Sequence, residues 1–112
     1  MTVYLDNANI PANVGGVSAR WSHLTADTPD ELHQFADQLG LRRSWYQGRC
    51  KHTACPTVDG SCAHFHYDVV AARRAHALRL GAQPVDLRKL GQIISARRPA
   101  FRVANEEADD RG

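Results

Sequence analysis

The segment CKHTACPTVDGSCAHFH, residues 50–66, restricts the folding of this chain more than any other feature. It contains every cysteine of the protein, Cys50, Cys55 and Cys62, together with three of its six histidines. Thiolates and imidazoles are the ligands that zinc prefers, in sets of four arranged as a tetrahedron. A polar segment without an apolar core of its own needs such a ligand to become ordered. We therefore predict a zinc-binding loop at this position.

The spacing leaves the fourth ligand open. The three cysteines supply three ligands, and either His52 or His64 is placed to be the fourth. The pattern C-x4-C-x6-C-x-H lacks the paired C-x2-C knuckles of common zinc fingers, so the alternative is three reduced cysteines in a polar loop. A closed set of three cysteines and one histidine would be structural, whereas an open coordination position would indicate catalysis.

Length and composition indicate one soluble domain. The chain has 112 residues, of which 43% are hydrophobic and 23% charged, and one core forms at this size without additional staples. Because no run of about 18 apolar residues and no signal-peptide pattern is present, we expect a cytoplasmic protein without a membrane segment. An odd number of cysteines in a reducing compartment favours metal binding or free thiols over disulfides. The net charge of +2 permits an anionic partner.

Short β-rich stretches alternate with helical stretches along the chain. Residues 7–16 contain asparagine, proline and two glycines, so they are expected to form a loop. The expected strands cover residues 2–6, 21–26, 42–47 and 83–85. The expected helices cover residues 29–39, 69–80 and 87–97.

The first of these helices has the clearest boundaries. Thr28 is a preferred N-cap, Glu31 completes a capping box, and Gly40 follows the last apolar position as a C-cap residue. Asp68 and Asp86 are the expected N-caps of the second and third helices. Pro99 is expected to lie beyond the end of the third helix.

This element order predicts the fold class. We expect a small single-domain α/β sandwich with a mostly parallel four-stranded sheet, about three helices and a Cys/His metal-binding loop. The domain is expected to span residues 1–103, with the zinc loop inserted at about residues 48–65 and a disordered acidic tail at residues 104–112. Functional residues of such sheets gather beyond the carboxyl ends of strands, which here brings Asp6, Gln47 and the loop to one edge.

The residues after the last cysteine allow three interpretations. His64 and His66 are two positions apart, so in an extended segment they share a face and could bind one metal. At the start of a helix, His66 and Tyr67 would instead be placed to donate to a phosphate. In the third interpretation Asp68 caps the helix, Tyr67 packs in the core and His66 is polar surface. The spacing alone leaves all three open.

Asp6, at the end of the first strand, is a candidate ligand of a divalent metal. The stretch YLDNANI resembles the opening of PIN-like and NYN-type ribonucleases, in which an acidic residue ends the first strand. That resemblance implies several converging carboxylates, and the candidates are Asp27, Asp68 and Asp86. The alternative is that Asp6 is a turn former before a loop.

Basic residues surround two aromatic residues between positions 42 and 51. The set consists of Arg42, Arg43, Arg49 and Lys51 with Trp45 and Tyr46. Arginine and lysine neutralise phosphates and aromatic rings stack on bases, so a nucleic acid or nucleotide is a candidate partner. The alternative is a solvated face with Trp45 in the core. A homo-oligomer is also compatible with the sequence.

Longer motifs carry a more specific resemblance. The runs HLTADTPDELHQFADQLGLRRSWYQ and HYDVVAARRAHALRLGA resemble a small bacterial and bacteriophage domain family of unknown function, over most of residues 2–86. The matching residues are Asp6, His23, Leu24, Glu31, Leu32, His33, Trp45, Gln47, His66, Tyr67, Asp68 and Arg74. The resemblance implies no assigned activity, but it implies a shared polar set that includes His23 and His66. The cysteine-bearing segment departs from the family pattern and is interpreted as an insertion.

These observations lead to one leading hypothesis and one alternative. The leading hypothesis is a domain with a structural zinc and a polar pocket that binds a phosphate-bearing ligand, as a hydrolase or nuclease. The candidate catalytic residues are His66 as acid or base, Asp6 as metal or substrate ligand, and His23. The candidate ligand-binding residues are Gln47, Tyr67, Asp68, Arg74 and His33, and the candidate zinc ligands are Cys50, Cys55, Cys62, His64 and His52. The alternative is a non-catalytic module that binds nucleic acid or a protein through the Arg42–Lys51 face.

Overall fold

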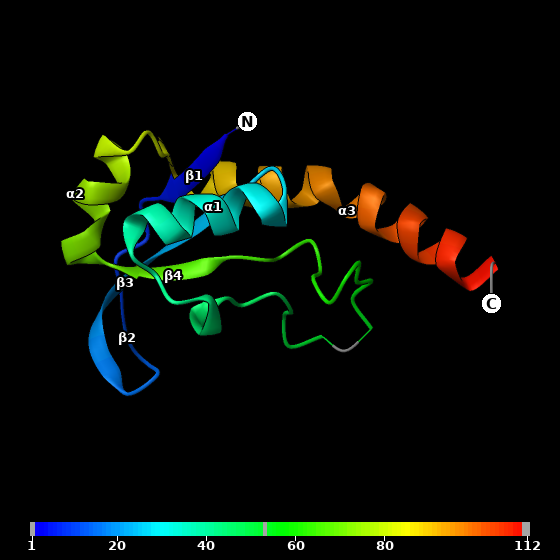
Figure 1. Cartoon of the computed structure of the whole chain (residues 1–112), viewed down its shortest axis with the longest axis horizontal. Coiled ribbons are helices and arrows are strands. Elements are labelled where there is room, and N and C mark those ends of the chain that lie inside the picture. Colours follow the sequence, from blue (N-terminus) through cyan, green and yellow to red (C-terminus); the bar gives the residue numbers. More distant parts are fainter. Residues whose placement is uncertain (1, 53, 111–112) are drawn as a thin grey trace.

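The protein is an α/β domain built on one mixed sheet (Figure 1). The computed structural model describes residues 2–52 and 54–110, with side chains described as far as Val103. The strands are β1 Val3–Asp6, β2 Ile10–Val14, β3 Val17–Ala26, β4 Tyr67–Val70 and β5 Gln83–Val85. The helices are α1 Pro29–Leu39, the short 3-10 helix η1 Arg43–Trp45, α2 Ala71–Arg79 and α3 Leu87–Asp110.

The sheet differs from the prediction in strand number and in direction. It has five strands, and β3 pairs antiparallel with β1, β2 and β4, whereas β1 and β5 are parallel. The predicted mostly parallel four-stranded sheet is therefore wrong. Residues 67–70 form the unpredicted strand β4, and residues 10–14 form β2 rather than a loop and turn into β3 through Gly15 and Gly16. These glycines have φ of 58° and 84°, the positive values that a two-residue hairpin requires.

The predicted strand at residues 42–47 is a 3-10 turn instead. The Trp45 amide donates to the Arg42 carbonyl at 2.9 Å, and the Tyr46 amide donates to the Arg43 carbonyl at 3.0 Å. Only Gln47 of this segment forms a β-bridge, and its partner is His66.

The predicted second helix begins later than expected. Val69 and Val70 belong to β4, and α2 starts at Ala71 without a side-chain cap. β-Branched side chains favour a strand, which outweighs the capping signal of Asp68. Asp68 therefore lies within a strand rather than at a helix N-terminus. This change decides which residues share a face at the candidate site.

Helix α1 forms as predicted and covers the core. The Thr28 hydroxyl accepts from the Glu31 amide at 3.3 Å, and Gly40 ends the helix in the left-handed conformation with φ of 84°. The buried side of the helix consists of Leu32, Phe35, Ala36 and Leu39. These side chains pack with residues of the sheet and its flanks, which are Leu5, Leu24, Ala26, Leu41, Phe65, Tyr67, Val69, Ala77 and Ala82.

Helix α3 begins as predicted but continues further. The Asp86 carboxylate caps it by accepting from the Lys89 amide at 2.7 Å. The helix contains Pro99 and extends to Asp110. Phe101 packs against the core, with its ring centroid 6.3 Å from that of Phe65, and this contact favours helix beyond the proline. Of the segment predicted to be a disordered tail, residues 104–110 lie in α3 and residues 111–112 lie outside the described part of the chain.

None of the described helices combines the length and the apolar character needed to cross a membrane.

Arg97 connects α3 to the rest of the domain. Its guanidinium donates to the Ala26 carbonyl at 2.6 Å, to the Thr25 hydroxyl at 3.0 Å and to the Ala63 carbonyl at 2.5 Å. It also lies 4.1 Å from the centre of the Phe65 ring. Burial lowers the pKa of Arg97 to about 10. One side chain thus holds the helix, the sheet and the end of the Cys/His loop together.

Replacing Arg97 with alanine is expected to lower the free energy of unfolding by about 2–4 kcal/mol, because it leaves buried acceptors without a charged donor. Urea denaturation followed by circular dichroism measures this loss. Arg102→Ala is the matched control, since Arg102 is an exposed arginine of the same helix. Equal stability of the two variants would contradict the role assigned to Arg97.

Candidate metal centres and the adjoining cavity

Four of the predicted zinc ligands come together in the structure. One donor atom each of Cys50, Cys55, Cys62 and His64 lies within 4.8 Å of the other three. The Nδ1 atom of His64 is 3.7 Å from the Cys55 sulfur and 3.6 Å from the Cys62 sulfur. Ligands that surround a zinc ion tetrahedrally are about 3.5–3.8 Å apart when two or more of them are sulfur. The cluster therefore has the composition and the dimensions of a Cys3His metal site.

A tight turn brings these ligands together. Val58 and Ser61 exchange two backbone hydrogen bonds of 2.8 and 3.0 Å across Asp59 and Gly60. Asp59 and Gly60 have φ of 52° and 83°, which is the left-handed pair of a two-residue hairpin. Cys62 follows this hairpin directly and is fully buried. The loop therefore enters the core at the same point at which it presents its third cysteine.

His64 rather than His52 completes the cluster. His52 is exposed, and its carbonyl accepts from the Cys55 amide at 3.1 Å. Burial, with the nearby Arg98 and Arg97 charges, lowers the pKa of His64 and favours its neutral form. The Arg98 guanidinium donates to Nε2 of His64 at 3.1 Å. Since a metal on Nδ1 would place the proton on Nε2, the exposed Arg98 side chain would have to turn toward solvent on metal binding.

The surroundings of Cys55 oppose ionisation of its thiol. Burial, followed by the neighbouring Cys50 and Cys62 thiols, raises the pKa of Cys55 to about 11. The His52 carbonyl is the main cause that lowers the pKa of Cys50. Thiolates are the form that binds metal, and a divalent ion would supply the positive charge that three adjacent thiolates need.

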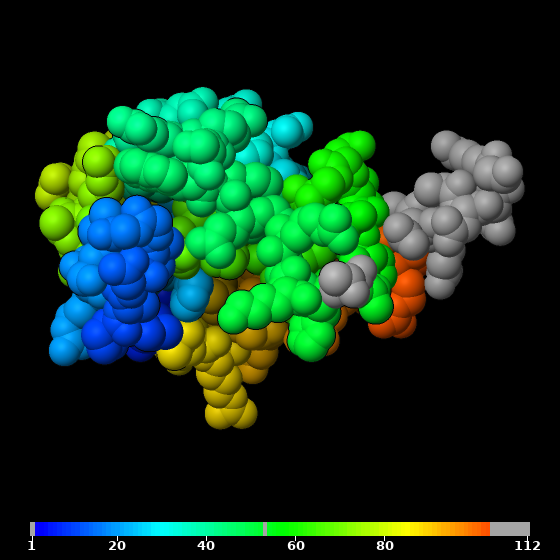
Figure 2. Space-filling view, turned by 90° about the horizontal axis from the view of Figure 1, so that it is seen from below, coloured from blue at the N-terminus to red at the C-terminus, as the bar shows by residue number. Residues whose placement is uncertain are grey.

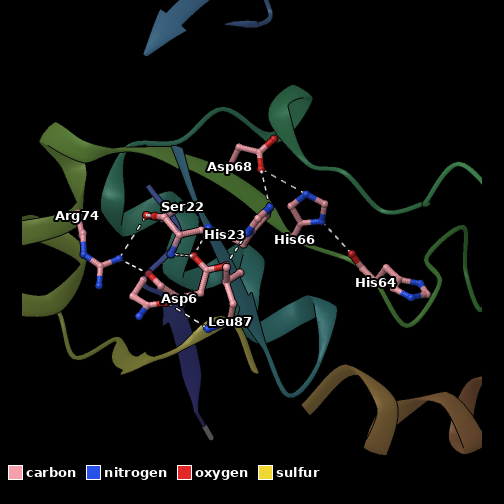
Figure 3. A network of polar contacts seen from close by, with 10 residues as sticks. Asp6, Ser22, His23, His64, His66, Asp68, Arg74 and Leu87 are labelled. Carbon is pink, nitrogen blue, oxygen red and sulfur yellow. Dashed lines mark hydrogen bonds and ion pairs between the residues drawn. The ribbon is translucent and has the colours of Figure 1, made fainter. Parts of the chain in front are cut away.

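A second cluster lies across β3 and β4 and consists of His23, His66 and Asp68 (Figure 3). His23 and Asp68 are paired residues of these antiparallel strands, so their side chains leave the same face of the sheet. His66 precedes β4 by one residue and lies two positions before Asp68, so it shares that face. Nε2 of His66 is 3.4 Å and Nε2 of His23 is 4.0 Å from Oδ1 of Asp68.

Asp6 orients His23 from the interior. This carboxylate is fully buried and accepts from Nδ1 of His23 at 2.6 Å. It also accepts from the His23 amide at 2.9 Å and the Ala8 amide at 3.2 Å. The hydrogen bond with Asp6 raises the pKa of His23. Asp6 is thus placed to position a histidine, not to contact a bound ligand as the sequence suggested.

The other two members of the cluster are held in the same way. Nδ1 of His66 donates to the His64 carbonyl at 2.8 Å, and the Gln47 amide group donates to Oδ2 of Asp68. Burial alone would raise the pKa of Asp68, but its contacts with His66, His23 and Gln47 outweigh burial and lower it. Asp68 is therefore ionised at neutral pH, and its Oδ1 faces both imidazoles.

A cavity of about 460 Å³ adjoins this second cluster. Its apolar walls are Val14, Val17, Trp21, Leu41, Trp45, Tyr46 and Val70, and its polar edge is formed by Ser44, Gln47, Asp68 and Arg73. It lies between the β2–β3 hairpin and the segment that contains η1. Figure 2 shows this hairpin in blue against the blue-green segment, with the green Cys/His loop further along the molecule. Cavities of this size accommodate small organic ligands.

Several predicted site residues lie elsewhere. Tyr67 is fully buried, and its hydroxyl pairs with Nδ1 of His33 at 2.9 Å on the side of the sheet that α1 covers. Arg74 donates to the Asp6 carbonyl and, at 3.3 Å, to the Ser22 hydroxyl. It supports the cluster from behind and does not belong to it. Gln47 and Asp68 are the predicted ligand-binding residues that do line the cavity.

The carboxylates that a PIN-like site would need do not converge. Asp27 accepts from the Thr2 amide at 3.1 Å and from the Tyr4 hydroxyl at 2.8 Å. Asp86 caps α3. His23 lies between Asp6 and Asp68 and contacts both. The arrangement thus has two imidazoles and one accessible carboxylate in place of a set of acidic residues.

The pairing of His23 with Asp68 was missed from the sequence, because HYDVV was interpreted as a helix start. The sequence signal for a strand was present in Val69 and Val70, because β-branched residues favour strands. With residues 67–70 taken as a strand, His66 and Asp68 fall on one face and Tyr67 and Val69 on the other. The contacts of Arg97 and Arg98 with the end of the Cys/His loop carried no signal, since they depend on how α3 packs.

Comparison with known proteins supports the resemblance to a family of unknown function. A family model described as "Protein of unknown function (DUF4031)" matches residues 3–97. No match was found among curated proteins or among solved structures. The matched region contains the Cys3His cluster, the His23–His66–Asp68 cluster and all strands of the sheet. The chain belongs to the DUF4031 family.

Proposed function

We propose that this protein is a hydrolase of phosphate esters, with its reaction centre at the His23–His66–Asp68 cluster and a structural zinc in the Cys3His cluster. One observation carries the hydrolase proposal: two imidazoles and an ionised carboxylate converge at the edge of a cavity of about 460 Å³. Such groups activate water, either as acid and base or as ligands of a metal. Asp68 belongs both to the cluster and to the cavity lining, so a bound ligand would reach the reactive groups.

The character of the cavity supports a phosphate-bearing ligand with an aromatic part. Trp21, Trp45 and Tyr46 line it, and aromatic rings stack on nucleobases and similar planar groups. Arg73 lies at its polar edge. The chain carries a net charge of +2, which favours an anionic ligand over a cationic one.

The zinc proposal depends on the donor set of the Cys3His cluster. All four donors are protein side chains, and Cys62 is fully buried. A closed tetrahedral set of this kind binds zinc structurally and leaves no position for substrate. A reducing cytoplasm would keep the three thiols available for the metal.

Turnover on a panel of phosphate esters tests the hydrolase proposal. The panel contains bis-p-nitrophenyl phosphate, p-nitrophenyl phosphate, nucleoside monophosphates and cyclic nucleotides, each assayed with and without added divalent metal. The expected result is release of product by the wild-type chain and by His76→Ala, since His76 lies on α2 outside both clusters. A chain that is folded and loaded with metal but has no turnover on any member of the panel would refute the proposal.

A second candidate function is nucleic-acid binding without catalysis. The observation in its favour is that the Arg42 guanidinium lies 5.7 Å from the centre of the Trp45 ring, which is 45% exposed. A stacked arginine and tryptophan on one surface suit an unpaired base and its phosphate.

For this second function, the double variant Arg42→Ala/Arg43→Ala is expected to lose most of its affinity for single-stranded RNA and to show a weaker salt dependence. Fluorescence anisotropy of a labelled oligonucleotide at rising salt measures both effects. The matched control is Arg88→Ala/Lys89→Ala, which removes equal charge from exposed positions of α3. Absence of binding by the wild-type chain at low salt would exclude this function.

A further inference from the structure

We infer that His23, His66 and Asp68 bind a second divalent metal ion, of the first transition series, through two imidazole nitrogens and one carboxylate oxygen. This inference gives the mechanism of the proposed hydrolase and rests on the proposed function only for its role in catalysis. Three lines of geometry support the metal site: the proton positions on the two imidazoles, the distances between the donor atoms, and access from one side.

The hydrogen bonds of His23 point its free nitrogen toward Asp68. A buried carboxylate accepts hydrogen bonds, so the 2.6 Å contact with Asp6 places the proton on Nδ1 of His23. The lone pair of the neutral ring is then on Nε2, which faces Oδ1 of Asp68 (Figure 3). A carboxylate behind a histidine is the usual outer partner of a metal-bound imidazole, because it fixes the ring and strengthens the ligand.

A different hydrogen bond orients the His66 ring so that its Nε2 also points toward Asp68. A backbone carbonyl only accepts, so the 2.8 Å contact with the His64 carbonyl places the proton on Nδ1 of His66. Its Nε2 lone pair also faces Oδ1 of Asp68 (Figure 3). Two histidines from separate segments thus present the same nitrogen to the same carboxylate oxygen, each with its proton held on the far side.

The distance from Asp68 to His66 suits two ligands of one metal better than a direct hydrogen bond, and the distance from Asp68 to His23 is longer than either. The three donor atoms lie within 4.8 Å of one another. Oδ1 of Asp68 is 3.4 Å from Nε2 of His66 and 4.0 Å from Nε2 of His23. A good N–H···O hydrogen bond is about 2.7–3.2 Å long, whereas ligands about 2.0–2.2 Å from a metal lie about 3.0–3.6 Å apart. The Gln47 amide holds the other carboxylate oxygen, which leaves Oδ1 available.

The cluster is open on one side. The side chains of His23 and His66 are 32% and 25% exposed, and that of Asp68 is 14% exposed. Three protein ligands that leave the other coordination positions of the metal open to solvent are typical of a catalytic site, in contrast to the closed Cys3His set. Two imidazoles and a carboxylate favour Zn²⁺, Fe²⁺, Co²⁺ or Mn²⁺ over Mg²⁺ or Ca²⁺, which prefer oxygen ligands.

A metal here would complete the hydrolytic reaction without another co-reactant. With a metal held by His23, His66 and Asp68, a water molecule bound to it would add its oxygen to phosphorus and lose a proton to solvent. The bond between phosphorus and the ester oxygen breaks, and the departing oxygen takes up a proton, so atoms and charge balance.

Co²⁺ titration of the full chain, followed by absorption spectroscopy, distinguishes the two centres. Co²⁺ in the Cys3His cluster produces a thiolate-to-metal charge-transfer band, whereas Co²⁺ bound by nitrogen and oxygen produces only weak visible bands. The expected result is an additional equivalent of Co²⁺ that binds without the charge-transfer band. His66→Ala should remove this equivalent, and so should Asp68→Asn, which preserves the shape of the side chain. His76→Ala should retain it.

The positioning role of Asp6 has its own readout. Asp6→Asn is expected to weaken Co²⁺ binding at this site about 10–100-fold, as the loss of an outer partner does at known metal sites. Binding at the Cys3His cluster should not change, and circular dichroism melting confirms that each variant is folded. The inference is overturned if His66→Ala and Asp68→Asn bind Co²⁺ with the stoichiometry and affinity of the wild-type chain.

The titration separates this inference from the proposed function. Metal bound at this site without turnover on any phosphate ester would support the site and refute the hydrolase. Turnover that persists unchanged when only the zinc of the Cys3His cluster is bound would support the hydrolase and refute the catalytic role of the second metal.

Discussion

Replacing Cys62 with serine is expected to abolish zinc binding by the Cys3His cluster and to lower the melting temperature by about 10 °C. A structural metal contributes its binding energy to folding, and loss of a ligand present at 100 times its Kd costs about 2.7 kcal/mol. For a domain of this size, 1 kcal/mol corresponds to about 4 °C. Elemental analysis and thermal denaturation followed by circular dichroism measure the two effects.

The effect should reach the whole domain because the Cys3His cluster is continuous with the core. Cys62, Ala63 and Phe65 are fully buried, and Arg97 binds the Ala63 carbonyl from α3. Cys55 is more accessible, so Cys55→Ser should also remove a zinc ligand and loosen the loop, without the added cost of a buried hydroxyl in the core. His52→Ala tests the ligand assignment, since His52 lies outside the cluster and this variant should keep its zinc. A Cys62→Ser chain with wild-type zinc content and melting temperature would contradict the structural role.

The elements that sequence reasoning found are those whose signals are local. Thr28 and Gly40 mark the two ends of α1 through caps that depend only on neighbouring residues. Strand β5 at Gln83–Val85 also matches its predicted range. The errors occurred where two local signals compete. Asp68 has the sequence context of a helix cap, but the following valines pair with β3, and pairing is a tertiary effect. Gly15 and Gly16 were predicted to lie in a loop, but β2 was not predicted, and only residues 21–26 of β3 were predicted as a strand.

At the candidate sites, too, local sequence signals were sufficient only where the residues lie close together in the chain. The Cys3His cluster was predictable because its ligands lie close together in the sequence, and only the choice between His52 and His64 depended on the folded structure. The second cluster joins His23 to residues more than forty positions away, so the antiparallel register of β3 and β4 had to be known. The role of Asp6 also depends on burial, since a fully buried carboxylate orients a neighbour and does not hold a ligand in solvent.

The variant expected to affect activity most is His66→Ala, which should lower kcat/KM for a phosphate-ester substrate by at least about 10²-fold. The alanine removes one of three donors of the proposed second metal, so water activation is lost while the cavity is unchanged. His66 does not line that cavity. The loss should therefore appear mainly in kcat, with little change in KM.

Two further variants separate a chemical role of His66 from a structural one. His66→Gln retains a side-chain oxygen that can bind a metal, so part of the activity should return at high Co²⁺ or Mn²⁺ concentration. His66→Ala has no such donor and should not respond to added metal. Melting temperatures close to wild type are expected for both, because His66 is partly exposed and contributes one hydrogen bond to the His64 carbonyl. If both variants keep wild-type kcat, His66 has no part in the reaction, and the activity must arise at another site of the chain.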